Sequence, residues 1–171
     1  MKKVAIFIDH ENLVHSSEKV IGEKYNIEVL LEEANKEGRV IIGKVYVPFL
    51  PDSFKRNSYL YNFHKNGIDP VYTPSYEQSN NGEVKSLGDP MLICDVMQSL
   101  YEYPQIDVFV ICSGDKDMVP LIRKLAQMGK EVLVIGVAAT SAQILINECS
   151  RLKFRYQDYQ EMHRPITRRA E

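Results

Sequence analysis

The stretch FVICSGDKDMVP, residues 109–120, decides the fold. Its apolar beginning belongs to a run over residues 107–112 that predicts a buried strand. Small polar residues follow at once, and an amphipathic pattern from Met118 onward predicts a helix. The stretch therefore places two carboxylates, Asp115 and Asp117, at the carboxyl end of a strand. In open α/β sheets, ligands bind at that edge.

A second apolar run, residues 4–8, ends directly at Asp9. If the two runs form parallel neighbouring strands, Asp9 lies at the same edge as Asp115 and Asp117. Strand and helix patterns alternate along the rest of the chain, which predicts a mostly parallel sheet covered by helices on both faces. The predicted fold class is α/β, in a single domain.

The other expected elements come from hydrophobic periodicity, with glycine and proline as stop signals. Further strands are expected over residues 39–47, 68–73, 131–137 and 152–156. Helices are expected over residues 12–22, 27–36, 53–66, 89–101, 118–128 and 141–149. The strand over 152–156 is expected at the edge of the sheet, where it would allow a homodimer. Residues 74–88 are polar and too long for an ordinary connection, which predicts a functional or mobile loop.

Composition sets the broad class of protein. The 171 residues suffice for one domain, which we expect over residues 1–160, followed by a basic tail over 161–171. Lys and Arg total 21 against 23 Asp and Glu, so the net charge of -2 gives no whole-molecule attraction to nucleic acid. The three cysteines are isolated, which favours free thiols in a reducing cytoplasm over a zinc site. No run approaches the roughly 20 apolar residues of a membrane span, so no membrane partner is expected.

Four carboxylates fall where the loops should converge. They are Asp9, Asp89, Asp115 and Asp117. Carboxylates that share a small site repel one another unless a cation or a proton compensates. Oxygen ligands favour Mg²⁺ or Mn²⁺ over zinc. Ions held in this way activate water and neutralise phosphate charge, so the pattern predicts phosphodiester or phosphoryl hydrolysis.

Each acidic residue also has a structural interpretation. Asp89 could cap the helix that follows, with Pro90 in its first position, and Asp117 could cap the helix from Met118. Capping explains each residue singly but does not explain why they gather at one edge. Asp95 lies about 9 Å along the helix from Asp89 and about 120° around it, so helix geometry alone does not let them share a ligand set. Asp95 is an outer candidate or a buried structural acid, and His10 is not needed for metal-dependent hydrolysis.

Three motifs in order carry a family resemblance. They are FIDHEN at residues 7–12, KSLGD at 85–89 with Asp95 six residues later, and SGDKD at 113–117 followed by Pro120-Leu121 and by GKEV at 129–132. With these motifs the chain resembles the NYN-domain family, the LabA-like branch of the PIN-like nucleases. The spacing from Lys85 to Asp89 is one residue longer than in the family's usual K-G-x-D.

The resemblance implies a PIN-like fold, a Rossmann-like three-layer sandwich, with metal-dependent ribonuclease activity. It implies that the four aspartates form the catalytic metal site, and that Asn12 and Ser113 help to place the substrate or the ion. The family also includes proteins without shown activity. The alternative is therefore a catalytically silent PIN-like protein that binds RNA or a protein partner and regulates it.

Basic residues near the acids are the expected substrate contacts, because the acidic site must attract a polyanion. Lys85 and Lys116 are the candidates for phosphate contacts. The helix expected over 53–66 carries basic and aromatic side chains that could stack the bases of single-stranded RNA. The same helix also fits a partly buried amphipathic helix with a solvated charged side, and this second interpretation is favoured.

Overall fold

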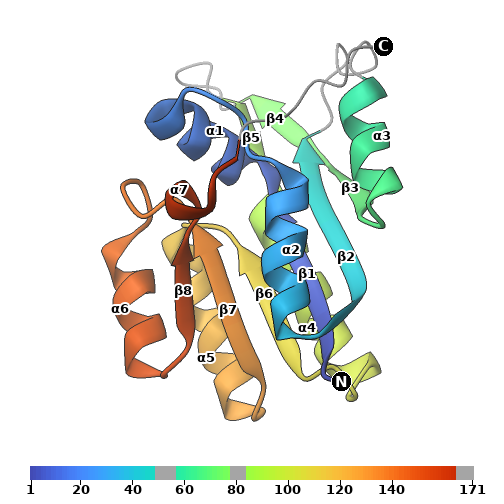
Figure 1. The fold of residues 1–171 in the computed structure, drawn as a ribbon, viewed down its shortest axis with the longest axis vertical. Helices are drawn as coiled ribbons and strands as arrows, with labels where there is room; N and C mark the ends of the chain where they lie inside the picture. The colour runs from blue at the N-terminus through green and yellow to red at the C-terminus, as the bar shows by residue number, and fades with distance from the viewer. Residues whose placement is uncertain (49–56, 78–83, 165–171) are drawn as a thin grey trace.

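A six-stranded sheet forms the centre of the computed structural model, which describes residues 1–48, 57–77 and 84–164 (Figure 1). Every neighbouring pair of strands in this sheet is parallel, in the order β3-β2-β1-β6-β7-β8. The strands are β1 Lys3–Asp9, β2 Arg39–Pro48, β3 Asp69–Thr73, β6 Val108–Cys112, β7 Glu131–Gly136 and β8 Arg155–Asp158. The predicted α/β class is confirmed, and β8 lies at the edge of the sheet as expected.

Helices cover both faces of the sheet and complete a three-layer sandwich. They are α1 His10–Ile21, α2 Ile27–Glu37, α3 Asn57–Lys65, α4 Gly88–Glu102, α5 Val119–Gln127, α6 Gln143–Arg151 and α7 Tyr159–Met162, with a short 3₁₀ helix, η2 Lys116–Met118. Figure 1 shows α1, α2 and α7 on the side of the sheet that faces the viewer, with α4 and α5 behind it. No helix among the described residues is long and apolar enough to span a membrane.

Strand β1 shows why the two faces have separate cores. Its residues from Val4 to Ile8 are all fully buried, and they alternate between the two hydrophobic clusters. Ile6 packs with α1 and α2, whereas Phe7 packs with α4 and α5. Successive side chains of a strand point to opposite faces, so a strand that is apolar throughout belongs in the middle of a covered sheet.

The strand order reverses direction between β1 and β6. The chain passes from β1 to β2 and β3 on one side, and then returns to β6, β7 and β8 on the other side. In this parallel pair Ile8 lies opposite Cys112, so the next residues, Asp9 and Ser113, leave the sheet side by side. Ligands of open α/β sheets bind at this kind of switch point, because the loops that leave it splay apart.

The polar segment over 74–88, expected as a functional or mobile loop, contains strands that the sequence pattern did not predict. It contains two short strands, β4 Ser75–Glu77 and β5 Val84–Ser86, which pair antiparallel. Three-residue strands of mixed polarity carry too little alternation to be recognised from sequence. Two other elements begin two or three residues later than expected. The strand expected over 152–156 forms over 155–158, and the helix expected over 141–149 forms over 143–151.

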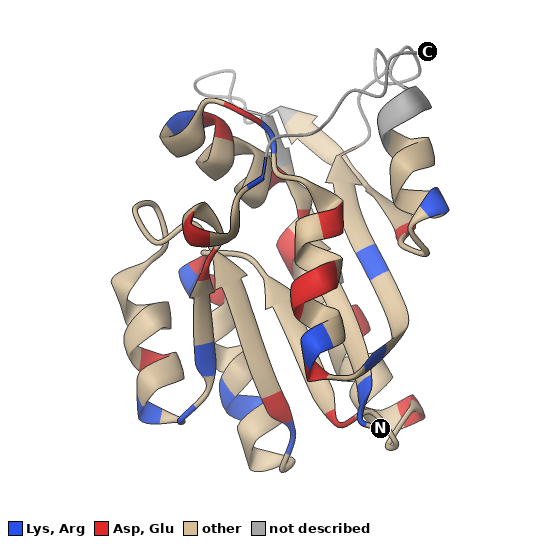
Figure 2. Cartoon of the chain, in the orientation of Figure 1, with Lys and Arg blue, Asp and Glu red and all other residues tan. Residues whose placement is uncertain are grey.

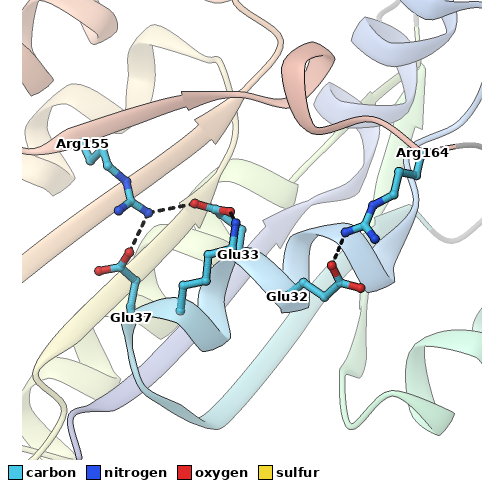
Figure 3. Close-up of polar contacts among 6 residues, drawn as sticks. Glu32, Glu33, Glu37, Arg155 and Arg164 are labelled. Carbon is cyan, nitrogen blue, oxygen red and sulfur yellow. Dashed lines mark hydrogen bonds and ion pairs between the residues drawn. The ribbon is translucent and has the colours of Figure 1, made fainter.

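The C-terminal segment is attached to helix α2 by ion pairs (Figure 3). Arg155 of β8 lies 2.9 Å from the Glu33 carboxylate and 2.6 Å from that of Glu37. Beyond α7, Arg164 pairs with Glu32. Arg164 falls within the tail expected over 161–171, so the described beginning of that tail contacts the domain. Residues 165–171 lie outside the described part of the chain.

Glu148 joins α5 to α6, and we predict that this link fails in acid. The buried Glu148 carboxylate accepts hydrogen bonds from Arg151 and from Arg123, whose Nε lies 2.7 Å away. These partners lower the pKa of Glu148 from its ordinary 4.5 to about 2. Because this pKa is lower in the folded state, the stabilisation is complete above pH 4.5 and disappears as the pH falls toward 2.

Urea unfolding across this pH range tests the prediction. We expect Glu148→Gln to have a lower free energy of unfolding than the wild type at neutral pH. Between neutral and acid pH, the variant should lose less stability than the wild type does. Glu102→Gln, an exposed change on α4, is the control and should retain the wild-type pH dependence. Parallel pH profiles for Glu148→Gln and wild type would contradict the assignment.

Candidate metal centre

Asp9 lies at the base of the site, where β1 ends and α1 begins. Its Oδ1 accepts a hydrogen bond from the Asn12 backbone N–H at 3.1 Å, which makes Asp9 the N-cap of α1. Its Oδ2 accepts from Ser113 Oγ at 2.9 Å, directly across the β1–β6 pair. The side chain is buried, so these two partners set its orientation.

The turn after β6 is held by hydrogen bonds between residues that are close in sequence. The Asp115 backbone N–H donates to Ser113 Oγ at 3.2 Å, and the Asp117 N–H donates to Asp115 Oδ1 at 2.8 Å. Asn12 reaches across from α1, where its Oδ1 accepts from the Gly114 N–H at 2.8 Å. We call residues 113–117 the acidic turn. Asn12 and Ser113 thus have protein partners, and their expected contacts with substrate or ion stay a prediction.

The capping interpretations of Asp89 and Asp117 are wrong. Helix α4 begins at Gly88, and its cap, Leu87, makes no side-chain capping bond. Asp89 is the second residue of the helix and Pro90 the third, so neither holds the position expected for it. The cap of η2 is Asp115, with Asp117 inside the 3₁₀ turn. The Asp89 side chain is therefore available to the other carboxylates.

Three of the four predicted carboxylates gather in one group. Asp89, Asp115 and Asp117 each offer an oxygen, and these oxygens all lie within 4.8 Å of one another. Asp9 adjoins the group through a hydrogen bond to Asp89. Segments separated by more than a hundred residues in sequence therefore meet at this edge.

The crowding of negative charge perturbs the two innermost acids. Burial, and then the charge of Asp89, raise the pKa of Asp9 well above its ordinary 3.8. Burial also raises the pKa of Asp89; the hydrogen bond from Asp9 opposes this effect, and the charges of Asp115 and Asp117 add to it. A cation or a proton bound at the site would relieve the repulsion between these carboxylates.

The group fits a small hard cation. An octahedral Mg²⁺ site holds its oxygens about 2.1 Å from the ion, so that opposite oxygens lie about 4.2 Å apart. The three oxygens all lie within 4.8 Å of one another, an upper limit about 0.6 Å larger than this separation. The donors are carboxylates, the preferred ligands of Mg²⁺ and Mn²⁺.

A clasp between α1 and the β4–β5 hairpin was not found by the sequence reasoning. Ser86 Oγ donates to Glu11 Oε2 and accepts from the Gly88 N–H at 3.3 Å. It ties the start of α4, and with it Asp89, to the first turn of α1. Glu11 also adds to the negative charge that raises the pKa of Asp89. The signal in the sequence was only the polar character of the two segments.

Two residues near the site have structural partners of their own. Asp95 Oδ2 accepts hydrogen bonds from Tyr46 OH at 2.7 Å and from Lys44 Nζ at 2.9 Å, both on β2. Asp95 is only half-buried, and its choice between the two alternatives stays a prediction. His10 shares a 2.7 Å hydrogen bond with Tyr25 OH, and burial lowers its pKa to about 4, so it is neutral at physiological pH.

The basic candidates are less well placed. Lys116 is exposed within η2, between Asp115 and Asp117. Lys85 lies on β5, and its side chain is outside the described part of the structure. On α3, Tyr61 and His64 are exposed, whereas the predicted contributors at 55 and 56 fall outside the described residues.

The fold and this acidic edge define a class of protein: a Rossmann-like, PIN-like α/β domain with a cluster of carboxylates at its switch point. The NYN domain family matches residues 3–156, nearly the whole chain. The chain belongs to the NYN domain family, a family of PIN-like nucleases. The family expected from the three motifs is confirmed.

Two individual proteins are similar to the chain. The uncharacterized protein MJ0482 of Methanocaldococcus jannaschii is 24% identical over 136 residues, which are 78% of this chain and 47% of that protein. The chain thus spans about half the length of this relative. The crystal structure of VPA0982, a protein of unknown function from Vibrio parahaemolyticus, matches with a TM-score of 0.75 and 24% identity. That match covers 86% of this chain and 88% of the other, and it supports the fold.

We predict that Asp9→Asn stabilises the metal-free protein and weakens its response to metal. Because the pKa of Asp9 is higher in the folded state, stability falls as the pH rises from 3.8 toward that pKa. The neutral amide removes this cost, because it carries no charge to bury beside Asp89.

Thermal unfolding of both proteins at several pH values, with and without Mn²⁺, measures the effect. We expect a higher Tm for Asp9→Asn without metal at neutral pH, and a larger Mn²⁺-induced rise for the wild type. A lower Tm for the metal-free variant at neutral pH would show that Asp9 does not carry the strained charge.

Proposed function

We propose that the protein is a metal-dependent ribonuclease that hydrolyses phosphodiester bonds in single-stranded RNA with Mg²⁺ or Mn²⁺. One observation carries the proposal: three carboxylates from two segments, α4 and the acidic turn, meet within 4.8 Å at the switch point of a nuclease-family fold. Structural roles leave this convergence unexplained, because Asp89 caps no helix and Asp117 is exposed.

The roles of the side chains follow from their positions. Asp89, Asp115 and Asp117 would hold the ion with one oxygen each. When bound, the ion supplies a nucleophilic water at neutral pH and neutralises phosphate charge. Asp9 lies beside Asp89, and burial together with the charge of Asp89 raises the pKa of Asp9. Ser113 in turn orients Asp9.

Substrate attraction would come from local groups. Figure 2 shows Lys and Arg spread over many elements of the described chain. Lys116 is the exposed cation closest in sequence to the acids, and it would contact a phosphate. Leu87 and Tyr76 are 40% and 51% exposed on the hairpin segment that leads into Asp89. Exposed apolar and aromatic groups of this kind favour unpaired bases over a duplex.

Cleavage of labelled single-stranded RNA tests the proposal. We expect cleavage by the wild type with Mn²⁺ or Mg²⁺ and none with a chelator. Asp115→Asn and Asp89→Asn should each reduce the cleavage rate by more than about 100-fold. Loss of an outer partner of a metal site alone reduces activity or metal affinity by about 10–100-fold, and these residues would bind the ion directly. Asp69→Asn, a matched change at the exposed start of β3, should retain full activity.

Two other results would redirect the assignment. Cleavage that persists undiminished in both site variants would reject the site. Mn²⁺ binding that depends on Asp89 and Asp115, without cleavage of any RNA, would instead favour the alternative function. In that case the protein would be catalytically silent and would bind RNA or a protein partner through the same site.

A further inference from the structure

The acidic turn is fastened from two sides at Gly114. The Gly114 N–H donates to Asn12 Oδ1 at 2.8 Å, and the Gly114 carbonyl accepts from the Ala142 N–H at 2.9 Å. Ala142 belongs to the loop between β7 and α6. Both peptide groups of Gly114 are therefore held by elements that lie outside the turn itself.

A pair of hydroxyl groups fills the space next to this glycine. Tyr156 OH, from β8, donates to Ser141 Oγ at 2.6 Å, and Ser141 Oγ donates to the Val137 carbonyl at 3.0 Å. The Ser141 backbone N–H donates to the same carbonyl at 2.9 Å. Burial raises the pKa of Tyr156 to about 12, so its hydroxyl keeps its proton at neutral pH.

The contact between this pair and the turn is close. A Cβ at Gly114 would lie only 2.3 Å from Ser141 Oγ and 3.0 Å from Ser141 Cα. A Cβ at Gly136 would lie 2.7 Å from Ser141 Oγ and 2.8 Å from Tyr156 OH. Side chains larger than hydrogen do not fit at either position. The Ser141 hydroxyl thus lies directly against the backbone of the acidic turn.

We propose that Ser141 and Tyr156 are positioning residues that set the place of the acidic turn, and thereby of Asp115 and Asp117 relative to Asp89. The claim that these residues position the turn depends only on the contacts described above. The claim that they thereby affect metal binding also rests on the proposed function. Neither residue is among the carboxylates that would hold the ion. They act through Gly114.

The position of the turn matters because its acids have few other restraints. Asp117 is exposed, and its backbone N–H is held only within the turn, by Asp115. A shift of Gly114 therefore moves both carboxylates. A displacement of about 1 Å at a reactive site can cost about 100-fold in rate. The edge strand β8, which contributes no predicted site residue, is coupled to the site in this way.

Hydrogen exchange of individual amides in the metal-free protein tests the positioning directly. The Gly114 and Asp115 amides are hydrogen-bonded and report on the turn. Tyr156→Phe keeps the ring and removes only the hydroxyl, and Ser141→Ala removes its partner. We expect each variant to speed exchange at Gly114 and Asp115 by about 3- to 10-fold, the effect of one lost hydrogen bond, with little change elsewhere.

Tyr159→Phe is the matched control. It removes a buried hydroxyl that accepts from the Asn26 N–H at 2.7 Å, on the other face of the sheet. It should lower the Tm without a selective change at Gly114 or Asp115. Wild-type exchange at these amides in both Tyr156→Phe and Ser141→Ala, or an equal rise over the whole protein, would overturn the proposal.

Mn²⁺ titration of the same proteins connects the turn to the ion. We expect Tyr156→Phe to bind Mn²⁺ about tenfold more weakly than the wild type, the lower end of outer-partner effects, and Tyr159→Phe to bind equally well. If the wild type binds Mn²⁺ and Tyr156→Phe binds it with the same affinity, the link between the turn and the ion is overturned. A wild type that binds no Mn²⁺ would remove the proposed function, while the exchange result would still decide the positioning.

Discussion

The parallel pairing of β1 with β6 is the constraint on which the candidate site depends. It places the last residue of one strand, Asp9, beside the first residue after the other, Ser113. Their 2.9 Å hydrogen bond connects the two loops at the point where the strand order reverses. Each later contact of the site, from Asn12 to Gly114 and from Asp9 to Asp89, builds on this adjacency.

The pairing also creates an electrostatic cost. It brings carboxylates together at a partly buried edge, where their charges cannot be fully hydrated. The spacing of the oxygens allows a cation to relieve this cost. An arrangement that is unfavourable without a ligand is typical of a functional site, because stability alone would favour its removal.

Neutral groups do most of the positioning around these charges. Hydroxyls of Ser113, Ser86 and Ser141, the Asn12 amide and backbone N–H groups hold the loops without adding charge of their own. Among the described residues, ion pairs connect α5 with α6, α2 with the C-terminal segment, and Lys44 of β2 with Asp95 of α4. This separation leaves the acidic edge free of arginine or lysine partners among the described contacts, so its charge stays available to a cation.

The amino-acid pattern was enough to predict the layers of the fold, the convergence of Asp9 with the acidic turn, and the family. Continuous apolar runs that end in carboxylates have one favourable arrangement, as buried parallel strands with their ends at one edge, and that rule needs no coordinates. Only the tertiary structure decided the rest. The β4–β5 hairpin, the Glu11–Ser86 clasp, the pairing of Asp95 with Lys44 and Tyr46, and the contact of Ser141 and Tyr156 with Gly114 join residues that are distant in the chain. Short polar segments have no periodicity from which such partners could be read, because a hydrogen bond between distant side chains depends on where packing places their backbones.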